Sequence, residues 1–387
     1  MIAKILLPIL SGLLCTGLYF DMVHLRRRHW AWRLLLWLAV AALMLYSVHI
    51  ARKPGYFPPD FQQLFRYLDV LCAVAAPACI VALCGTMGHF IRHHRQRGER
   101  AGCVVAIAAV TAYLYGTYVE PEKLVVRHTE YYSADLPKAF HGYRIVLFSD
   151  AHVGTLTGAR RKLLQRAIDS INAQQPDLVA FTGDLQNMMP SEIAGAQETL
   201  RTIKAADGIF SVLGNHDYTQ YLPPLSAQAE EDSLDKTCRL QREMGWTLLR
   251  NENRCLRRHG DSIFIAGMEN DGQGDRFPAY GNVQQALWHV TTRDFVVMLE
   301  HDPTSWRRKI LPQSHTQLTL SGHTHGGQLD IAGLTPALLA YREYGGMYHL
   351  NRRALYVTTG LSGVVPLRLG VVPEIVVITL KKQENNH

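Results

Sequence analysis

The sequence predicts an α/β domain that follows an N-terminal region of four membrane-spanning helices. Three observations support this prediction. Four long apolar stretches lie within the first 120 of the 387 residues. From Tyr143 onward, short apolar runs alternate with amphipathic stretches, a pattern typical of a layered α/β domain. Polar residues gather directly after several of the short runs, where the strands of such a domain carry their ligand-binding groups.

The four apolar stretches are each roughly 17 to 25 residues long, enough to cross a hydrocarbon core about 30 Å thick. A single stretch could be a buried core helix, but four in succession indicate a membrane anchor. The first could instead be a cleaved signal peptide, but Leu13 and Leu14 stand before Cys15, where cleavage requires small residues. The predicted spans are Ile5–Leu25, Leu34–Ile50, Leu68–Ile91 and Gly102–Val119.

The basic residues predict how this anchor is oriented, because cationic loops resist translocation across a membrane. The formal net charge of the chain is +7, and arginines are densest after the first and third spans. We therefore expect these two loops in the cytoplasm, and everything after Val119 on the outer, periplasmic face of a bacterial inner membrane. The loops contain Arg26, Arg27, Arg28 and Arg33, then Arg52, Lys53 and Arg66, then Arg92, Arg95, Arg97 and Arg100.

Periodicity in the second half predicts alternating strands and helices. The predicted organisation is an anchor over 1–120, a linker leading into the domain over 121–142, the domain over 143–382 and a tail over 383–387. The predicted strands are Tyr143–Phe148, Asp177–Thr182, Ile209–Leu213, Ile263–Ala266, Phe295–Leu299, Gln317–Leu320, Leu355–Thr358 and Glu374–Leu380. The predicted helices are Ala159–Gln174, Ser191–Ala205 and Gln228–Met244.

The cysteines do not indicate a metal or redox site. Five of the seven lie inside the apolar stretches, where a thiol behaves as a small hydrophobic group. Cys238 and Cys255 are the pair in the second half, and they lack the spacing of a zinc or redox motif. On an outer membrane face they could form a disulfide; two unpaired thiols are the alternative.

Polar groups follow five of the predicted strands, so they should meet in one crevice at the carboxyl ends of the strands. Their donor atoms are carboxylate and amide oxygens with several imidazole nitrogens, a set suited to manganese, iron or zinc. No cysteine contributes, which excludes a typical structural zinc site. The groups are Asp150 and His152, Gly183 and Asp184, Gly214 to Asp217, His301, and Gly322 to His325.

The order of these motifs resembles the calcineurin-like metallophosphoesterase superfamily, over roughly residues 143–380. The matching blocks are Asp-x-His at Asp150, Gly-Asp at Gly183, Gly-Asn-His-Asp at Gly214, the lone His301, and Gly-His-x-His at Gly322. Together with the spans before it, the run Gly-His-Thr-His-Gly-Gly-Gln looks like the bacterial transmembrane branch of this superfamily. The resemblance implies an αββα sandwich and hydrolysis of a phosphate mono- or diester.

The resemblance also implies two divalent metal ions and assigns their ligands. A carboxylate can bridge ions about 3.5–4 Å apart, and such a pair activates a water molecule for attack on phosphorus. The implied ligands are Asp150, His152 and His325 for one ion, Asn215, His301 and His323 for the other, and Asp184 as the bridge.

Two residues beside the ligands have implied catalytic roles. The resemblance places His216 over the leaving group, where an imidazolium can donate a proton. Asp217 could orient the His216 ring from behind; a turn or capping residue is the alternative. Many relatives have an acidic residue where this chain has Asn187, but that position is not a ligand. A related branch that hydrolyses a UDP-2,3-diacylglucosamine lipid has Arg in place of His216, which disfavours that substrate.

Other functions fit the sequence less well. A non-catalytic receptor for a phosphorylated ligand should have lost ligand positions, and here all are filled. A transporter should carry a charge within a span, but Asp21, His49 and Asp69 lie at the span ends. No nucleic-acid-binding motif is present.

The region after the last ligand block, Leu329 to Tyr348, is rich in leucine and tyrosine. We expect a mobile lip over the site that touches the bilayer; a surface loop packed on the sheet edge is the alternative. A lip and a membrane anchor together favour a membrane-associated phosphate ester as substrate.

Overall fold

A computed structural model of the chain describes residues 2–52, 61–219, 221, 226–274 and 277–383. The chain divides into two compact units, of which the first reaches to Thr117 and the second begins at Tyr118. Of the predicted tail over 383–387, all but Gln383 lies outside the described residues.

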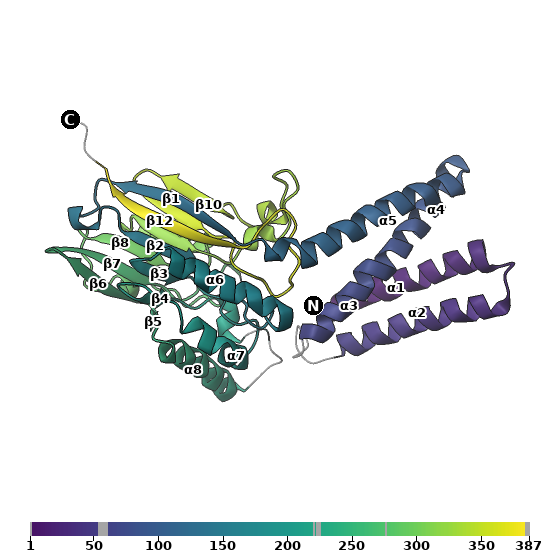
Figure 1. The fold of residues 1–387 in the computed structure, drawn as a ribbon, viewed down its shortest axis with the longest axis horizontal. Coiled ribbons are helices and arrows are strands. Elements are labelled where there is room, and N and C mark those ends of the chain that lie inside the picture. The colour runs from purple at the N-terminus through teal and green to yellow at the C-terminus, as the bar shows by residue number, and fades with distance from the viewer. Residues whose placement is uncertain (1, 53–60, 220, 222–225, 275–276, 384–387) are drawn as a thin grey trace. The chain divides into compact units, whose positions relative to one another are not determined.

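Unit 1 consists of long apolar helices in its described part (Figure 1). Its helices are α1 (Ile2–Phe20), α2 (Trp30–Ala51), α3 (Phe61–Val70), α4 (Ala76–Arg92) and α5 (Arg95–Tyr118). A π-helical turn extends α1 through Asp21–Leu25, and another, Leu71–Ala75, joins α3 to α4. Within the described residues, four stretches are long and apolar enough to span a membrane: Leu6–Leu25, Trp30–Ala51, Gln62–Ile91 and Arg95–Glu122. Each contains or overlaps one predicted span, which confirms that prediction.

The acidic side chains near the ends of these spans are paired inside unit 1. Asp21 accepts hydrogen bonds from Arg33 Nε at 2.6 Å and from Trp37 Nε1 at 3.2 Å. Asp69 accepts one from the Tyr113 hydroxyl at 2.7 Å. These carboxylates therefore stabilise contacts between helices, in agreement with an anchor.

The described part of unit 2 forms two six-stranded sheets. The first sheet contains, in spatial order, β1 (Val125–Ser133), β12 (Glu374–Lys382), β2 (Arg144–Phe148), β3 (Leu178–Phe181), β4 (Ile209–Ser211) and β5 (Thr247–Leu248). The second contains β10 (Gly346–Leu350), β11 (Arg353–Val357), β9 (Leu318–Ser321), β8 (Phe295–Leu299), β7 (Asp261–Gly267) and β6 (Glu252–Arg258). Strands β2 to β5 are parallel to one another, as are β11, β9, β8 and β7. Their carboxyl ends therefore lie together at one edge of each sheet.

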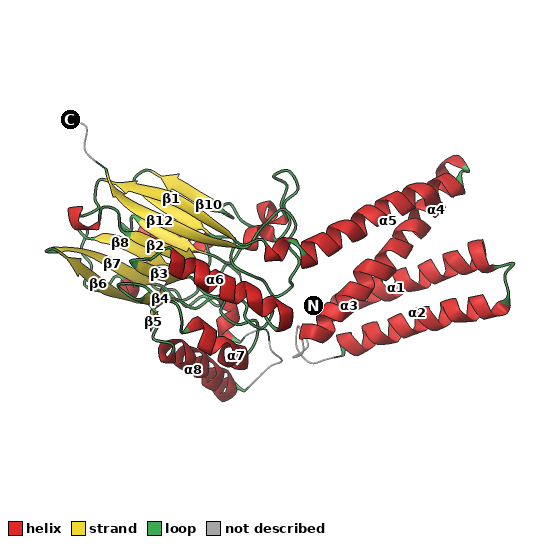
Figure 2. Ribbon diagram, in the orientation of Figure 1, coloured by secondary structure: helices red, strands yellow, loops and turns green. Residues whose placement is uncertain are grey.

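The two sheets pack face to face between helices, which confirms the predicted αββα sandwich (Figure 2). Helices α6 (Arg161–Ala173), α7 (Pro190–Leu200) and α8 (Ala227–Glu243) supply apolar side chains to the core on the outer face of the first sheet. The outer face of the second sheet packs against α9 (Val283–Ala286) and a π-helical turn, Trp306–Ile310, that leads into α10 (Leu311–Gln313).

Strand β2 is a continuous apolar run because both of its faces are covered. Ile145 and Leu147 belong to the core between the sheets, whereas Val146 and Phe148 belong to the core beneath the helices. Successive side chains of a strand point to opposite faces, so a strand covered on both faces needs apolar residues at every position. The strand ends at Phe148, and the polar residues of the first motif begin at once.

The region expected to be a linker is partly built into the sheet. Within 121–142, strand β1 pairs in parallel with β12, with Val125 opposite Glu374 and Ser133 opposite Lys382. The strand occupies a sheet edge, where its side chains are mostly exposed, so it lacks the apolar run by which the buried strands were predicted. Strands β5, β6 and β10 also lie at sheet edges and were not predicted: β6 is rich in polar residues, β10 is only partly buried, and β5 has just two residues.

Cys238 and Cys255 are both free thiols. Cys238 is buried against Leu213 and Leu248, whereas Cys255 is exposed on β6. Of the two readings of these cysteines, the structure supports unpaired thiols rather than a disulfide.

Candidate metal centre

The seven predicted ligands follow the carboxyl ends of five strands, and the structure brings them together. They are Asp150 and His152 after β2, Asp184 after β3, Asn215 after β4, His301 after β8, and His323 and His325 after β9. The first sheet supplies four of them and the second sheet three, so the centre joins the two sheets of the sandwich. Except for His325, which is partly exposed, all are buried.

Asp184 belongs to both groups of side chains that could hold an ion. In the first group it stands with Asp150, His152 and His325, and in the second with His301 and His323. Within each group the ligand atoms lie within 4.8 Å of one another. Among the residues that the structure describes, Asp184 is therefore the side chain shared by both groups, as the bridge of a binuclear site must be.

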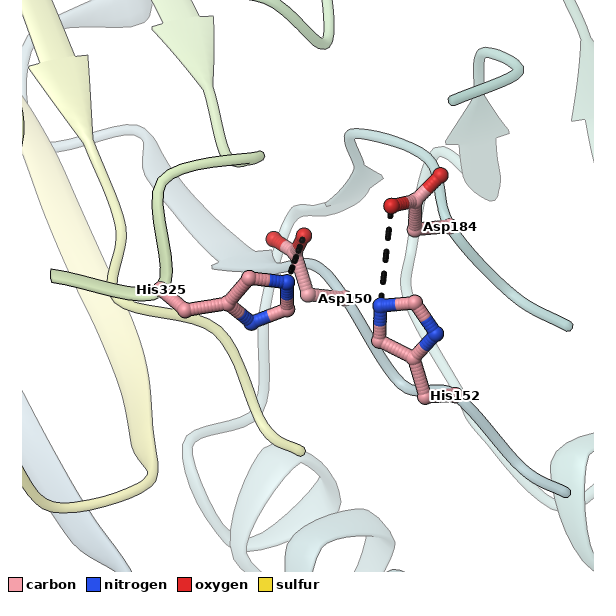
Figure 3. Close-up of side chains that lie close together, drawn as sticks. All are labelled: Asp150, His152, Asp184 and His325. Atoms are coloured by element: carbon pink, nitrogen blue, oxygen red, sulfur yellow. Dashed lines mark ion pairs between the residues drawn. The ribbon is translucent and has the colours of Figure 1, made fainter. Parts of the chain in front are cut away.

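The first group is drawn in Figure 3. Asp184 Oδ2 lies 3.5 Å from His152 Nε2, and Asp150 Oδ1 lies 3.5 Å from His325 Nε2. The other oxygen of Asp184 accepts a hydrogen bond from the backbone N–H of His216 at 2.9 Å. This bond fixes the carboxylate so that Oδ2 faces the imidazoles.

The second group lies on the other side of Asp184. His301 Nε2 is 3.3 Å from Asp184 Oδ2, 3.1 Å from Asn215 Oδ1 and 3.2 Å from His323 Nδ1. Oxygen and nitrogen atoms from the ends of four strands, β3, β4, β8 and β9, thus converge on one point. Asn215, which carries no charge, joins the second group through this contact.

The donor atoms fit a metal centre. Both ring nitrogens of His152 are buried without a hydrogen-bond partner, a costly arrangement unless a ligand satisfies one of them. Backbone carbonyls orient two other rings: His301 Nδ1 donates to Thr182 at 2.6 Å, and His325 Nδ1 donates to Ser362 at 2.9 Å. Such a bond fixes the tautomer and leaves Nε2 to bind a cation.

The electrostatics of the site favour the metal-binding forms of His152, His325 and Asp184, but not that of His301. Burial lowers the pKa of His152 well below its usual range and lowers that of His325 to about 4. Burial alone would raise the pKa of Asp184, but His301 and the other imidazoles around it reverse the shift and lower it strongly. For His301 burial also opposes protonation, yet the Asp184 charge raises its pKa to about 10. Metal binding at His301 must therefore displace a proton.

The backbone at the centre is strained. Five of the seven predicted ligands have positive φ angles: Asp150 (51°), His152 (42°), Asp184 (59°), His323 (72°) and His325 (51°). Residues other than glycine rarely adopt this conformation, which costs about 1–3 kcal/mol each. Such strain persists where surrounding contacts hold side chains in a required direction, and here the side chains point at one another.

Glycines allow the loops to approach the carboxylates. A Cβ atom at Gly214 would lie 2.2 Å from Asp184 Oδ1, and one at Gly322 would lie 2.3 Å from Asp150 Oδ2. Any larger residue would displace a predicted ligand. Glycine at these motif positions therefore serves close approach of the backbone to the carboxylates.

His216 lies beside the first group, and its ring packs edge-on against His152 at a centroid distance of 4.9 Å. Its Nδ1 donates to the backbone carbonyl of Asn187 at 2.6 Å, so Nε2 lies on the opposite side of the ring. The side chain is partly exposed, unlike most of the predicted ligands. This position suits a group that meets the substrate.

Asp217 does not orient the His216 ring, contrary to our expectation. Its buried carboxylate accepts hydrogen bonds from the backbone N–H groups of Asp184, Leu185 and Gly214, at 2.9 to 3.0 Å. Asp217 therefore ties together the loops that follow β3 and β4, which is the capping alternative. The orienting group for His216 is the Asn187 carbonyl.

Two residues that the sequence did not assign to the site support its predicted ligands, one by direct contact and one through a shared carbonyl. The hydroxyl of Tyr341 lies 3.0 Å from His323 Nε2, so part of the predicted lip does reach the centre. The buried guanidinium of Arg368 donates to the carbonyl of Ser362, which also accepts the hydrogen bond from His325. No sequence signal marks Arg368, because its contacts are to backbone atoms.

Comparison with known proteins agrees with this geometry. Residues 143–327 match the calcineurin-like phosphoesterase family. A Danio rerio protein named transmembrane protein with metallophosphoesterase domain is 31% identical over 292 residues, which cover 72% of this chain and 62% of that protein. YkuE of Bacillus subtilis, an uncharacterized metallophosphoesterase, is 31% identical over 71% of this chain and 92% of its own length. An uncharacterized metallophosphoesterase of Aquifex aeolicus is 29% identical over 71% of this chain and 99% of its own.

Proposed function

The chain belongs to the calcineurin-like phosphoesterase family, and on this premise we propose that it is a membrane-anchored hydrolase that cleaves a phosphate ester with two divalent metal ions. The observation that carries the proposal is the position of Asp184 in both metal-binding groups. A single-ion site would not need a buried carboxylate that faces imidazoles on two sides.

The ligands divide around that carboxylate. Two divalent ions, manganese, iron or zinc, would supply a hydroxide nucleophile and neutralise charge on the phosphoryl oxygens. The side chains that would hold them are Asp150, His152 and His325 on one side, Asn215, His301 and His323 on the other, and Asp184 between them.

His216 would donate a proton to the leaving oxygen. Its Nδ1 is engaged by the Asn187 carbonyl, so the proton must come from Nε2, on the side away from that loop. A positioned acid of this kind contributes typically about 10²–10⁴-fold to a rate. Asp217 contributes indirectly, because it holds the loops that carry Asp184 and His216 at their present distance.

The substrate we propose is a phosphate mono- or diester confined to a membrane. A soluble ester gives no reason for a four-helix anchor, whereas a lipid headgroup shares the plane in which the anchor holds the enzyme. From the arginine distribution, we also propose that the hydrolase domain faces the outer side of a bacterial inner membrane.

Purified full-length protein assayed on a panel of substrates tests this proposal. The panel should contain an aryl phosphomonoester, an aryl phosphodiester and a phospholipid with a terminal phosphate, each with manganese, with zinc or with a chelator. We expect turnover with metal and none with chelator. Undiminished turnover in chelator would contradict a metal-dependent reaction, and binding of all three substrates without turnover would favour a receptor.

A further inference from the structure

Apolar side chains concentrate on one loop of unit 2, residues 329–339, here called the apolar loop. Its most exposed members are Leu339 at 93%, Leu334 at 73%, Ile331 at 58% and Leu338 at 50% exposed. Elsewhere in the described part of this unit, large exposed side chains such as Trp288 are more scattered along the chain. Single exposed apolar residues are ordinary, but a cluster of them marks an interaction surface.

The exposure does not come from a loosely held segment. The backbones of Ile331 and Leu334 exchange two hydrogen bonds of 3.1 Å, and Asp330 Oδ1 accepts the N–H of Gly333 at 2.7 Å. The hydroxyl of Thr335 donates to the carbonyl of Gly326 at 2.8 Å. The loop is thus a closed turn that displays its leucines outward.

The same segment is attached to the metal centre. Gly326, to which Thr335 is bonded, directly follows the predicted ligand His325. Just beyond the loop, the hydroxyl of Tyr341 meets His323 Nε2 at 3.0 Å. What the apolar loop binds is therefore held close to the site.

We propose that the apolar loop inserts into the lipid surface of the membrane that the N-terminal helices span, and so brings lipid headgroups to the metal centre. The inference deepens the proposed function and rests on it for the substrate, but not for the lipid contact. Transfer of outward-facing leucine and isoleucine side chains from water into the acyl region lowers the free energy.

The chain itself argues for lipid as the occupant. The fourth candidate span ends at Glu122 and β1 begins at Val125, so two residues separate them, which extend over about 7 Å at most. Unit 2 therefore starts at the membrane surface, and lipid is always at hand at high local concentration. Arg342, beside the loop, has a side chain that is 76% exposed although its Nε lies 3.8 Å from Glu343 Oε1, and its charge matches the anionic headgroups of such a surface.

A fluorescence measurement tests the lipid contact without relying on activity. An environment-sensitive fluorescent amino acid is placed at position 339, or at Trp288 as the matched exposed control, in the full-length protein. Each form is reconstituted in phosphatidylcholine–phosphatidylglycerol vesicles that contain brominated lipid. We expect strong quenching at 339 and weak quenching at 288. Equally weak quenching at both positions would overturn the proposal, whether or not the enzyme is active, and would point to a protein partner.

A comparison of activities on a lipid substrate and a soluble substrate then tests whether lipid contact by the apolar loop contributes to the proposed function. L338S/L339S should hydrolyse a phospholipid with a terminal phosphate in the same vesicles about tenfold more slowly, because insertion weakens. Its hydrolysis of a soluble aryl phosphate should stay within about twofold, and W288S should change neither rate. Equal loss on both substrates would overturn the coupling, because the loop would then support the site itself. If position 339 is quenched but the enzyme hydrolyses soluble esters alone, the lipid contact of the apolar loop would stand and the proposed lipid substrate would be wrong.

Discussion

The backbone carbonyl of Asn187 holds Nδ1 of His216 at 2.6 Å, much as other backbone carbonyls hold Nδ1 of the predicted ligands His301 and His325. The His216 ring packs against His152 but belongs to neither of the two metal-binding groups. H216A should therefore retain its metal and lose about 10²–10⁴-fold in turnover, the usual contribution of a positioned acid. Metal analysis and steady-state kinetics check this, with H289A, which removes an exposed histidine, as the control. Loss of metal from H216A would instead show that the His216 side chain is a metal ligand.

Arg368 offers a second prediction, because it acts through a carbonyl that a ligand shares. Its Nη2 donates to Thr359 and Ser362, and Ser362 accepts the bond from His325 Nδ1. Lysine reaches less far than arginine and ends in a compact ammonium, so R368K should weaken the two contacts that Nη2 makes. Metal affinity should fall about 10–100-fold, as when groups behind a ligand are removed.

Arg353 provides the matched control, since its guanidinium also donates to two carbonyls, those of Leu311 and Ser314. Neither carbonyl contacts a predicted ligand. Titration calorimetry with manganese should show a loss for R368K and little change for R353K. Equal losses would mean that both arginines act on the fold alone.

At this scale the sequence predicts residue types better than contacts. The motifs locate the seven predicted ligands and His216, which the structure places at the ends of strands. They do not locate the Asn187 carbonyl or Arg368, since backbone acceptors leave no trace in residue identity. Asp217 was misassigned for the same reason: its partners are N–H groups that every loop possesses.

At the scale of the elements, a buried glutamate at the start of helix α7, Glu192, predicts that stability depends on pH. Glu192 accepts the N–H groups of Asn187, Met188 and Met189, and so holds the loop whose Asn187 carbonyl orients His216. Burial outweighs these donors and raises the pKa of Glu192 from 4.5 to about 7. In the native state the Glu192 carboxyl group therefore keeps its proton at pH values where the same group in the unfolded chain has lost it.

The sign of the effect follows from proton binding. Between about pH 4.5 and 7 the unfolded state binds fewer protons at this group, so its contribution to stability declines as pH rises. Glutamine does not titrate, so the Tm of E192Q minus the Tm of the wild type should increase as the pH is raised from about 5 to about 7.5. Thermal denaturation in detergent measures the difference, and E198Q, on an exposed side chain of the same helix, should show no such trend. A difference that is constant with pH would contradict the raised pKa.

The predictability of the elements depended on burial. All eight predicted strands exist, because strands covered on both faces need unbroken apolar runs. Strands β1 and β6 escaped prediction because these edge strands carry polar residues, β10 because it is only partly buried, and β5 because it has two residues. For β1 this changed the organisation, since the expected linker became part of the first sheet.

At the scale of the whole molecule, hydropathy predicted four spans, and the described residues contain four helices of the required length. Their orientation stays a prediction that rests on the arginine distribution. An alkaline phosphatase fusion after Val119 should be active in a bacterial host, because that reporter needs export. High activity from a cytoplasmic reporter at the same junction would reverse the orientation.

The central claim is a binuclear centre bridged by Asp184. The most direct measurement is the number of divalent ions bound per chain, titrated against phosphoesterase activity for the wild type and D184A. The account predicts two ions per wild-type chain, activity that appears as the second binds, and loss of both metal and turnover in D184A. Full activity with one ion per chain, or a D184A protein that keeps two ions, would contradict it.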